Sequence, residues 1–471
     1  MEVNISGSLG SYDPAGTPLF MPSVVVGSRG MQTDWIGERF VSDLGTSLLA
    51  DLAEIGPRLG ASEGERRGHE RVRRAFETAG VRDVELQEFD LTKWERGDAR
   101  VELTDPTERT FDPIALPGSP SGTVEAEFVH LGYGLPEDFE DADLEGTVVV
   151  TRSDVPDYHD RWLHRREKYF RAVDAGAAGF LFQNHVEGQL PPTGSVGGGT
   201  DVVGPIPAAG VSYEAGERLA RYDAEGSVRG TLSVETEISE GTSQNVVGVL
   251  GPDTEEEIVL CGHVDGHDIS EGALDNASGI AVVCEAAAGL AAVEDALERR
   301  VRVIGFGAEE LGLKGSQHYL ETTDPSTVTA VVNCDGVGRG RDMSVRTCGF
   351  DDLGDAVEDV AAEFNHPIDA VPRVSTHSDQ WPFVWRGVPG LAVGSDTGPG
   401  RGWGHTAADT LDKTDERAIR EHGILVARIV QLLADAERDI DRRDPAAIRD
   451  ELVAEKQDVS MRVAGEWPFD D

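Results

Sequence analysis

Five short segments of this chain carry His, Asp or Glu at or just after an apolar run that is typical of a strand. They are residues 262–268 (GHVDGHD), 272–279 (GALDNASG), 307–316 (GAEELGLKGS), 333–338 (NCDGVG) and 404–413 (GHTAADTLDK). In an open α/β sheet, the carboxyl ends of the strands deliver side chains to one ligand crevice. Nitrogen and oxygen donors without a thiolate pair at zinc-finger spacing favour a catalytic metal over a structural one. The segments therefore indicate a metallohydrolase that could hold two metal ions.

The first segment ends a predicted strand at His263, and Asp265 follows two residues later on the same face. The imidazole of His263 could bind a metal ion while Asp265 accepts the remaining ring N–H and fixes the tautomer. A surface histidine beside solvated acids is the alternative for this segment alone. His267 and Asp268 extend the cluster, and we assign both to the following loop.

Four further carboxylates and a second histidine belong to the predicted site. Asp275 precedes a predicted helix and could simply cap it, but its two oxygens could also bridge two ions about 3.5–4 Å apart. Glu309 and Glu310 follow an apolar strand, where two adjacent charges are costly unless a cation compensates them. One of the two glutamates could be a metal ligand and the other a general base; the alternative is a solvated acidic loop. Asp335 ends another strand, and His405 follows Gly-Trp-Gly in a loop.

The elements that must position these residues alternate between strand and helix from Ser243 onward. This alternation predicts an α/β fold with a doubly wound, mostly parallel sheet flanked by helices. Short strands, Gly/Pro turns and one central helix predict an inserted, smaller, β-rich α+β domain that carries no ligand cluster. We therefore divide the chain into five segments. Residues 1–30 are a leader without periodicity that we expect to be disordered. The catalytic domain comprises residues 31–109 and 236–441, the insert comprises residues 110–235, and residues 442–471 are an acidic C-terminal extension.

The chain is strongly acidic, since 42 Lys and Arg against 87 Asp and Glu give a formal charge of −45. Such a surface repels nucleic acid and anionic lipid, so we expect neither nucleic acid nor membrane as a partner. Dispersed acid is self-repelling at low salt, which suggests a halophilic protein of a salt-rich cytoplasm; an ordinary acidic enzyme is the alternative. We see no signal peptide and no bilayer-spanning run, and we expect the four cysteines to be buried free thiols.

The five segments and their order resemble the co-catalytic di-zinc exopeptidases, metallopeptidase family twenty-eight. That family includes bacterial leucyl-type aminopeptidases, carboxypeptidase Q and glutamate carboxypeptidases. The resemblance covers residues 35 to 440 approximately and includes LADLAEIGPRLG in the first helices. The motifs DAGAAGFLFQN and IPAAGVSYEAGERL resemble the protease-associated domain that many members carry.

The resemblance implies a role for each predicted site residue. One zinc ion would be held by His263 and Asp335, the other by Glu310 and His405, with Asp275 bridging them, Glu309 as general base and Asp265 as the partner of His263. Cobalt or manganese could replace the two zinc ions. The implied reaction is hydrolysis of a terminal peptide bond by a metal-bound water, with an aminopeptidase favoured. The alternatives are a carboxypeptidase or dipeptidase of the carboxypeptidase Q type, an acyl-transferring cyclase of the glutaminyl cyclase type, and a non-catalytic binding protein on the same scaffold.

The substrate side of the site is less defined. Family members often have Ser-Asp-His before an aromatic residue, whereas this chain has Ser-Asp-Gln at 378–380 with His377 in front, a departure that we assign to substrate binding. Three arginines, Arg373, Arg386 and Arg401, could hold a terminal carboxylate or could pair with surface acids. The loop 191–205 could act as a lid. The substrate is expected to be a peptide, and the oligomeric state is open, a homodimer being one option.

Overall fold

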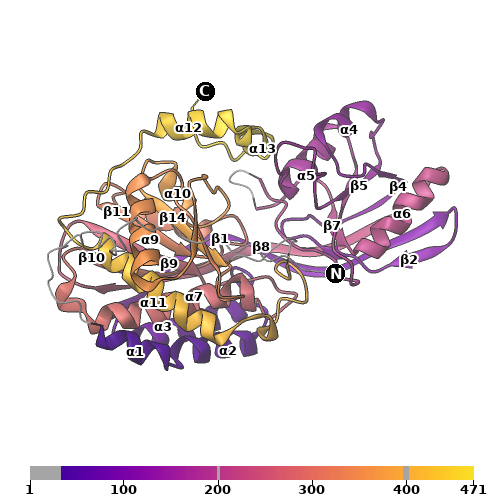
Figure 1. Ribbon diagram of the computed structural model, residues 1–471. Helices are drawn as coiled ribbons and strands as arrows, with labels where there is room; N and C mark the ends of the chain where they lie inside the picture. Colours follow the sequence, from indigo (N-terminus) through magenta and orange to yellow (C-terminus); the bar gives the residue numbers. More distant parts are fainter. Residues whose placement is uncertain (1–32, 199–201, 396–401, 471) are drawn as a thin grey trace, which may run out of the picture.

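The computed structural model describes residues 33–198, 202–395 and 402–470, so the predicted leader 1–30 lies outside the described residues. The chain forms two lobes joined by a pair of long strands (Figure 1). The larger lobe holds these elements: α1 (Asp34–Phe40), α2 (Leu44–Ile55), α3 (Glu63–Thr78), β9 (Glu257–His263), α7 (Ser278–Ala292), β10 (Arg300–Phe306), α8 (Lys314–Thr322), β11 (Val328–Cys334), β12 (Met343–Arg346), α9 (Asp351–Phe364), β13 (Ile368–Val371), α10 (Trp381–Val384), β14 (Gly390–Ser395) and α11 (Glu416–Leu433). Single turns of π-helix or 3-10 helix lie at Ala273–Ala277, Glu294–Ala296 and Leu411–Lys413.

The sheet of the larger lobe runs in the order β13-β12-β14-β11-β9-β10-β8, with β8 at Arg229–Leu250. Strands β14, β11, β9 and β10 are parallel, whereas β8 is antiparallel to β10 and β12 is antiparallel to β14; β13 is parallel to β12. The chain goes from β9 to β10, which lies on one side of β9, and then crosses to β11 on the other side of β9. In such a sheet, this reversal of strand order opens the crevice where ligands bind. The predicted doubly wound α/β fold is confirmed.

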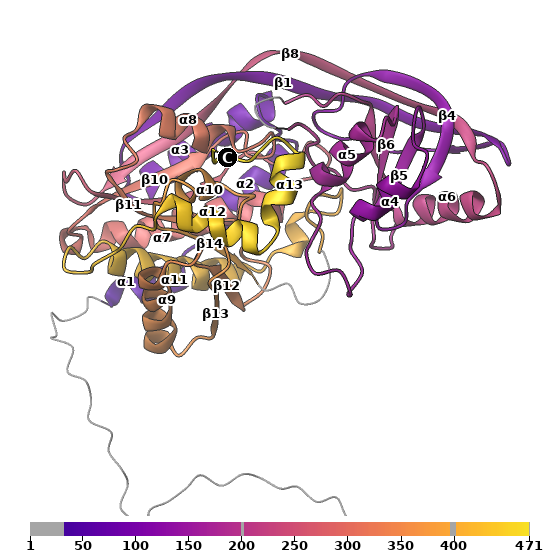
Figure 2. The same ribbon diagram turned by 90° about the horizontal axis from the view of Figure 1, so that it is seen from above.

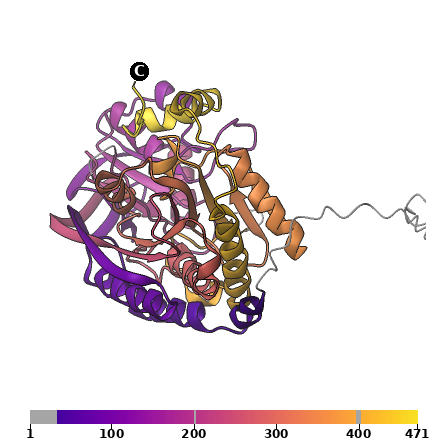
Figure 3. The same ribbon diagram turned by 90° about the vertical axis from the view of Figure 1, so that its left-hand side faces the viewer.

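Apolar residues alternate between the two faces of the central strands. On β9, Ile258 and Leu260 pack with α2, α3, α7 and α11, while Val259 and Cys261 pack with α8 and α10 on the other face. Figure 3 shows the indigo N-terminal helices side by side along one face of the sheet. Burial on both faces explains why these strands read as continuous apolar runs.

Helix α7 lies within this core. The stretch Ala273–Ala292 is long and apolar enough to cross a membrane, but 89% of its most apolar window is buried inside the protein, as expected of a core helix. Gly279, the second residue of α7, lies against β11, where a Cβ would come within 2.4 Å of the Cys334 carbonyl oxygen. A side chain at that position would push the helix away from the strand that carries Asp335. The four cysteines are buried and free, as predicted.

The smaller lobe is the inserted domain, and its elements are β2 (Arg109–Phe111), β3 (Ile114–Ala115), β4 (Gly122–His130), α4 (Pro136–Asp141), β5 (Val148–Arg152), α5 (Arg165–Asp174), β6 (Gly179–Gln183), β7 (Ala208–Val211) and α6 (Tyr213–Glu225). Strand β1 (Arg82–Asp105) pairs with β8 in both lobes, from Arg82 opposite Val249 to Asp105 opposite Arg229. Figure 2 shows this two-stranded ribbon arching from the larger lobe into the insert. The sequence predicted only residues 84–89 of β1 as strand, since its outer half is mostly polar.

The C-terminal segment crosses back from the larger lobe to the insert. Helices α12 (Pro445–Ala454) and α13 (Gln457–Val463) bury Ile448, Leu452 and Met461, and α13 contacts α5 of the insert (Figure 1). Ion pairs join Lys456 to Asp160 and Glu466 to Arg166. The segment is therefore part of the packed structure and ties the two lobes together.

Candidate metal centre and active site

The predicted site residues meet at the carboxyl ends of the parallel strands. His263 is the last residue of β9, Asp335 follows β11, and Glu309 and Glu310 follow β10. Asp275 lies in the π-helical turn before α7, and His405 lies in the loop after β14. Residues up to 142 positions apart in the chain thus face one another because the crevice collects the ends of neighbouring strands.

Asp275 lies between two histidines. Its Oδ1 is 3.3 Å from His263 Nε2, and its Oδ2 is 3.1 Å from His405 Nε2. His263 Nε2 is also 3.6 Å from Asp335 Oδ1, and His405 Nε2 is 3.7 Å from Glu310 Oε2. Each oxygen of one carboxylate therefore faces a separate group of donors, which is the arrangement of a bridging ligand between two ions.

Asp265 connects two of the strand ends. Its carboxylate accepts the main-chain N–H groups of Glu309 at 3.0 Å and Glu310 at 3.1 Å. The Nδ1 atom of His263 lies 3.4 Å from Asp265 Oδ1 and 3.2 Å from the Asp265 main-chain oxygen. Asp265 therefore orients both the imidazole and the pair of glutamates, a wider contact than the sequence indicated.

The unbalanced charge in this cluster alters the protonation of its members. Burial and then the charge of Asp275 raise the pKa of Glu310 to about 8, and burial holds the pKa of Glu309 well above its usual range. Burial opposes charging of His263, but the carboxylates around it, Glu309 and Asp265 among them, outweigh burial and raise its pKa well above the usual value. Raised proton affinity in a buried cluster of carboxylates and histidine marks a candidate functional site that a cation would neutralise.

The donor atoms fit a divalent metal ion. Four buried atoms make no hydrogen bond to any residue that the structure describes, namely His263 Nε2, both ring nitrogens of His267 and Glu310 Oε1. Buried polar atoms without partners are costly unless an ion satisfies them. Two groups have ligand atoms within 4.8 Å of one another: His263, Glu309 and Asp335, and His267, Glu310 and His405. Imidazole and carboxylate donors of this kind suit zinc and similar ions.

Comparison with known proteins agrees with this geometry. Residues 245–430 match the model of Peptidase family M28, and residues 122–219 match that of the PA domain. Residues 245–430 form a catalytic domain of peptidase family M28. The chain carries the PA domain as its insert, and as an M28 protein it is an enzyme, a metallo-exopeptidase of the hydrolase class.

The M28 relatives cover most of this chain. Aminopeptidase YwaD of Bacillus subtilis is 26% identical over 88% of each chain, and carboxypeptidase Q of Bos taurus is 24% identical over 84% of this chain and 86% of its own. The solved structure of BSAP, a zinc aminopeptidase from Bacillus subtilis, is 25% identical with a TM-score of 0.66, over 84% of this chain and 96% of that one. A peptidase M28 precursor from Shewanella amazonensis shares the fold with a TM-score of 0.72 at 23% identity, over 86% of this chain and 96% of that one.

Two buried groups below the M28 centre hold its loops, and the sequence interpretation missed both. The Arg58 guanidinium donates to the main-chain oxygens of Val264 and Gly272, and burial lowers its pKa to about 10. Asp409 accepts the N–H groups of Leu274 at 2.7 Å and Asp275 at 3.1 Å. Asp409 stands in the same segment as His405, but nothing in its type or spacing separates it from a solvated acid.

The segment 378–380 supports Asp335, a predicted metal ligand, in contrast to the substrate role that we assigned to the segment. Ser378 Oγ donates to Asp335 Oδ2 at 2.6 Å. Asn333 donates to Ser378 Oγ at 2.7 Å and to Gln380 Oε1 at 2.9 Å. Gln380 therefore belongs to a buried network that fixes Asp335, and only His377 of this stretch reaches the substrate side.

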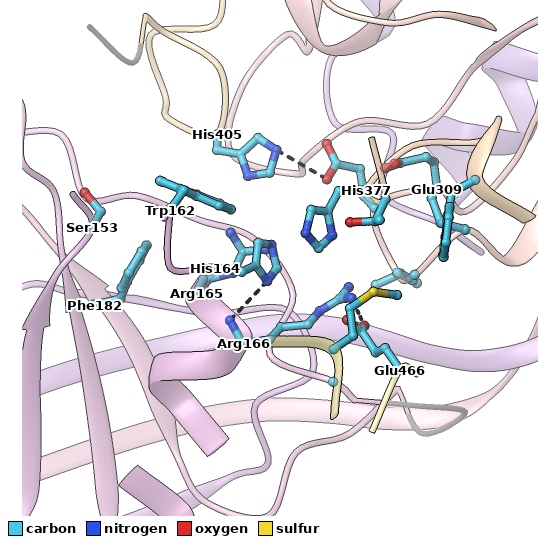
Figure 4. A pocket seen from close by; sticks show the side chains of 18 of the residues that line it. Ser153, Trp162, His164, Arg165, Arg166, Phe182, Glu309, His377, His405 and Glu466 are labelled. Atoms are coloured by element: carbon cyan, nitrogen blue, oxygen red, sulfur yellow. Dashed lines mark hydrogen bonds and ion pairs between the residues drawn. The ribbon is translucent and has the colours of Figure 1, made fainter. Parts of the chain in front are cut away.

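A cavity of about 800 Å³ opens above the M28 centre. We call one wall the floor, and it consists of Asp275, Glu309, Glu310, Asp335 and His405. We call the opposite wall the roof. It combines residues of the insert, among them Trp162, His164, Arg165 and Arg166, with residues of the C-terminal segment, among them Met461, Glu466 and Trp467. Figure 4 shows the rings of His164 and His377 next to each other between His405 and Glu466. The two rings stack with centroids 4.3 Å apart, so the insert and the catalytic domain meet inside the cavity.

Two of the three arginines proposed from the sequence lie away from this cavity. Arg373 pairs with Glu455, and Arg386 donates to the Pro382 oxygen and lies over Trp385. Arg401 lies outside the described residues. The loop 191–205 does approach the site, since Thr193 N donates to the His405 main-chain oxygen at 2.8 Å. Its role as a lid stays a prediction.

Proposed function

We propose that the protein is a two-zinc exopeptidase that removes the amino-terminal residue of short peptides. The observation that carries the proposal is the Asp275 carboxylate, whose two oxygens face His263 on one side and His405 on the other. A single carboxylate shared in this way suits two ions better than one. The aminopeptidases among the M28 relatives support the choice of the amino end.

The residues that would hold the ions follow from the distances. One zinc ion would be held by His263 and Asp335 and the other by Glu310 and His405, with Asp275 between them. When bound, the two ions would polarise the scissile carbonyl and lower the pKa of the attacking water. Asp265 would keep the His263 ring and the main chain of the two glutamates in place.

Glu309 is the group best placed to move a proton. It lines the cavity floor, and burial with the neighbouring Glu310 charge favours its protonated form. A carboxylate with a raised proton affinity can accept a proton from the attacking water and donate it to the nitrogen of the leaving amine. Both transfers involve the same side chain, so one residue would complete the cycle.

The roof supports the restriction to chain ends. Residues of the insert and of the C-terminal segment line the cavity opposite Asp275 and Glu309. The cavity of about 800 Å³ is within the range of sites that enclose small ligands, about 300–1,000 Å³. Such a space accepts the end of a peptide more readily than the middle of a folded chain.

A carboxypeptidase is the second candidate, and a specific observation favours it. Arg165 and Arg166 line the roof, and guanidinium groups recognise carboxylates in a bidentate manner. Arg166 already pairs with Glu466, and Arg165 donates to the Ser195 main-chain oxygen at 2.9 Å, which reduces their availability. Glu466 and Asp154 line the same wall and could hold a substrate ammonium, although each already pairs with an arginine, Arg166 and Arg152 respectively.

The test compares two substrates on the purified protein in molar potassium chloride with added zinc. One substrate is an unblocked aminoacyl anilide, and the other is an N-blocked dipeptide with a free carboxylate. We expect chelator-sensitive cleavage of the anilide alone. Cleavage of the dipeptide alone would establish the carboxypeptidase, and silence on both with zinc bound would contradict an exopeptidase of either kind. Activity that requires salt would support the halophilic, cytoplasmic setting, which we propose on the charge of −45.

A further inference from the structure

His267 lies closer to the metal centre than its place in a loop indicated. Its side chain is 3% exposed, and its Nε2 atom is 2.9 Å from Glu310 Oε2. Its ring meets the ring of His405 edge to face, with centroids 4.5 Å apart. His267 is four residues after His263 and belongs to none of the roles that the family resemblance implies.

The contact between His267 and Glu310 is not an ordinary hydrogen bond. Although the two atoms are 2.9 Å apart, neither ring nitrogen of His267 makes a hydrogen bond within the described part of the chain. The Oε1 atom of Glu310 also makes none. A buried ring nitrogen that lies beside a carboxylate oxygen without a hydrogen bond between them is the arrangement of two donors to one ion.

The donors lie near the spacing of a four-coordinate ion. Metal–ligand lengths of about 2.0–2.2 Å put the donors of a tetrahedral zinc site roughly 3.3–3.6 Å apart. The separations are 2.9 Å for His267 to Glu310, 3.7 Å for His405 to Glu310 and 3.1 Å for His405 to Asp275, so they lie on either side of this range. Donor atoms of His267, Glu310 and His405 therefore lie together with the Asp275 Oδ2 atom around one possible ion position.

We propose that His267 is a ligand of the ion at Glu310 and His405. This inference rests on the proposed two-metal function. That ion then has four protein donors, whereas the ion at His263 has His263, Asp335 and the other oxygen of Asp275. Sites with four protein ligands are closed, and sites with three keep a position for water or substrate. The two ions are therefore unequal: a closed, tightly held one and an open one at which substrate exchanges.

The test measures zinc affinity with buffered chelators and needs no turnover. In wild type we expect two dissociation constants, the tighter one belonging to the closed site. In His267→Gln the amide can still bond to Glu310 but is a poor zinc ligand, so the tight constant should weaken by at least about 100-fold while the other stays within about threefold. The matched control is His422→Gln, another buried histidine, which contacts the Arg341 main-chain oxygen and belongs to neither group of candidate ligands.

Two other outcomes separate the possible failures. If both constants stay within about threefold of wild type in His267→Gln, the ligand assignment is wrong while the two-metal function stands. If wild type itself binds fewer than two zinc ions, the proposed function fails. X-ray absorption on zinc-loaded wild type decides the matter even if the variant does not fold. Three imidazoles for two zinc ions would support His267 as a ligand, and two imidazoles would overturn it.

Discussion

The floor and the roof of the cavity are built in opposite ways. Directly behind the floor, His263 and Asp265 are fully buried, and the Asp265 carboxylate accepts the main-chain N–H groups of Glu309 and Glu310. The roof combines the insert with the C-terminal segment, its Trp162 is 53% exposed, and an ion pair between Arg166 and Glu466 links the two segments. The floor is thus rigid and sensitive to single atoms, while the roof can change without loss of the chemistry. We expect substitutions to divide accordingly.

The largest effect should come from Glu309 on the floor. Glu309→Gln keeps the shape of the side chain but cannot accept a proton, so kcat should fall by about 10²–10⁴-fold. Zinc content and thermal stability should match those of wild type, because the metal ligands and the core are unchanged. The measurements are steady-state kinetics, metal analysis and a thermal melt. Full activity in this variant would exclude Glu309 as the general base.

The second effect concerns the support below the floor. Asp409→Ala leaves the N–H groups of Leu274 and Asp275 without their acceptor. The free energy of unfolding should drop by roughly 2–4 kcal/mol, and zinc affinity should weaken by about 10–100-fold. The control is Asp412→Ala, an exposed acid three residues away, which should change stability by less than about 0.5 kcal/mol. Equal behaviour of the two variants would contradict the support role.

The third effect is a pH dependence of stability that originates under the floor. Burial lowers the pKa of His69 on α3 to about 4, below the unfolded value of 6.5. The unfolded chain then binds more protons between these values, so stability is full above pH 6.5 and falls as the pH drops towards 4, by up to about 3 kcal/mol. In His69→Gln this loss should disappear from the difference between urea unfolding curves at pH 7 and pH 4. His318→Gln, on the surface helix α8, should retain it.

The smallest effect should come from the roof. Glu466→Gln removes the ion pair with Arg166, and partly exposed pairs contribute about 0–1 kcal/mol. We expect a change of less than about fivefold in KM, no change in kcat, and a difference that shrinks in high salt. Glu455→Gln, whose partner Arg373 lies outside the cavity, serves as the control. A large fall in kcat would show that the roof takes part in the chemistry and would contradict the difference between floor and roof.

The same contrast explains what could be predicted from the sequence. The floor was accessible because His263, Asp335 and the glutamates each follow an apolar strand, and parallel strands deliver their ends to one edge. Arg58 and Asp409 were not, because they act on main-chain atoms of segments that only the folded chain brings near them. The roof was not either, since nothing local in the C-terminal segment shows that it reaches back to the insert.

The ribbon formed by β1 and β8 has a consequence for any attempt to make a smaller catalytic fragment. Its outer half pairs Val101 with Leu232 and Leu103 with Gly230, and the side chains of Val101, Leu103 and Leu232 are buried in the core of the insert. Removing the insert at its predicted borders, 110 and 235, would cut β8 and leave this half of β1 as an unpaired apolar edge. Such an edge is a template for aggregation between chains. A soluble fragment would have to be shortened into the ribbon itself, near the irregular pairing between Arg96 and Ala99.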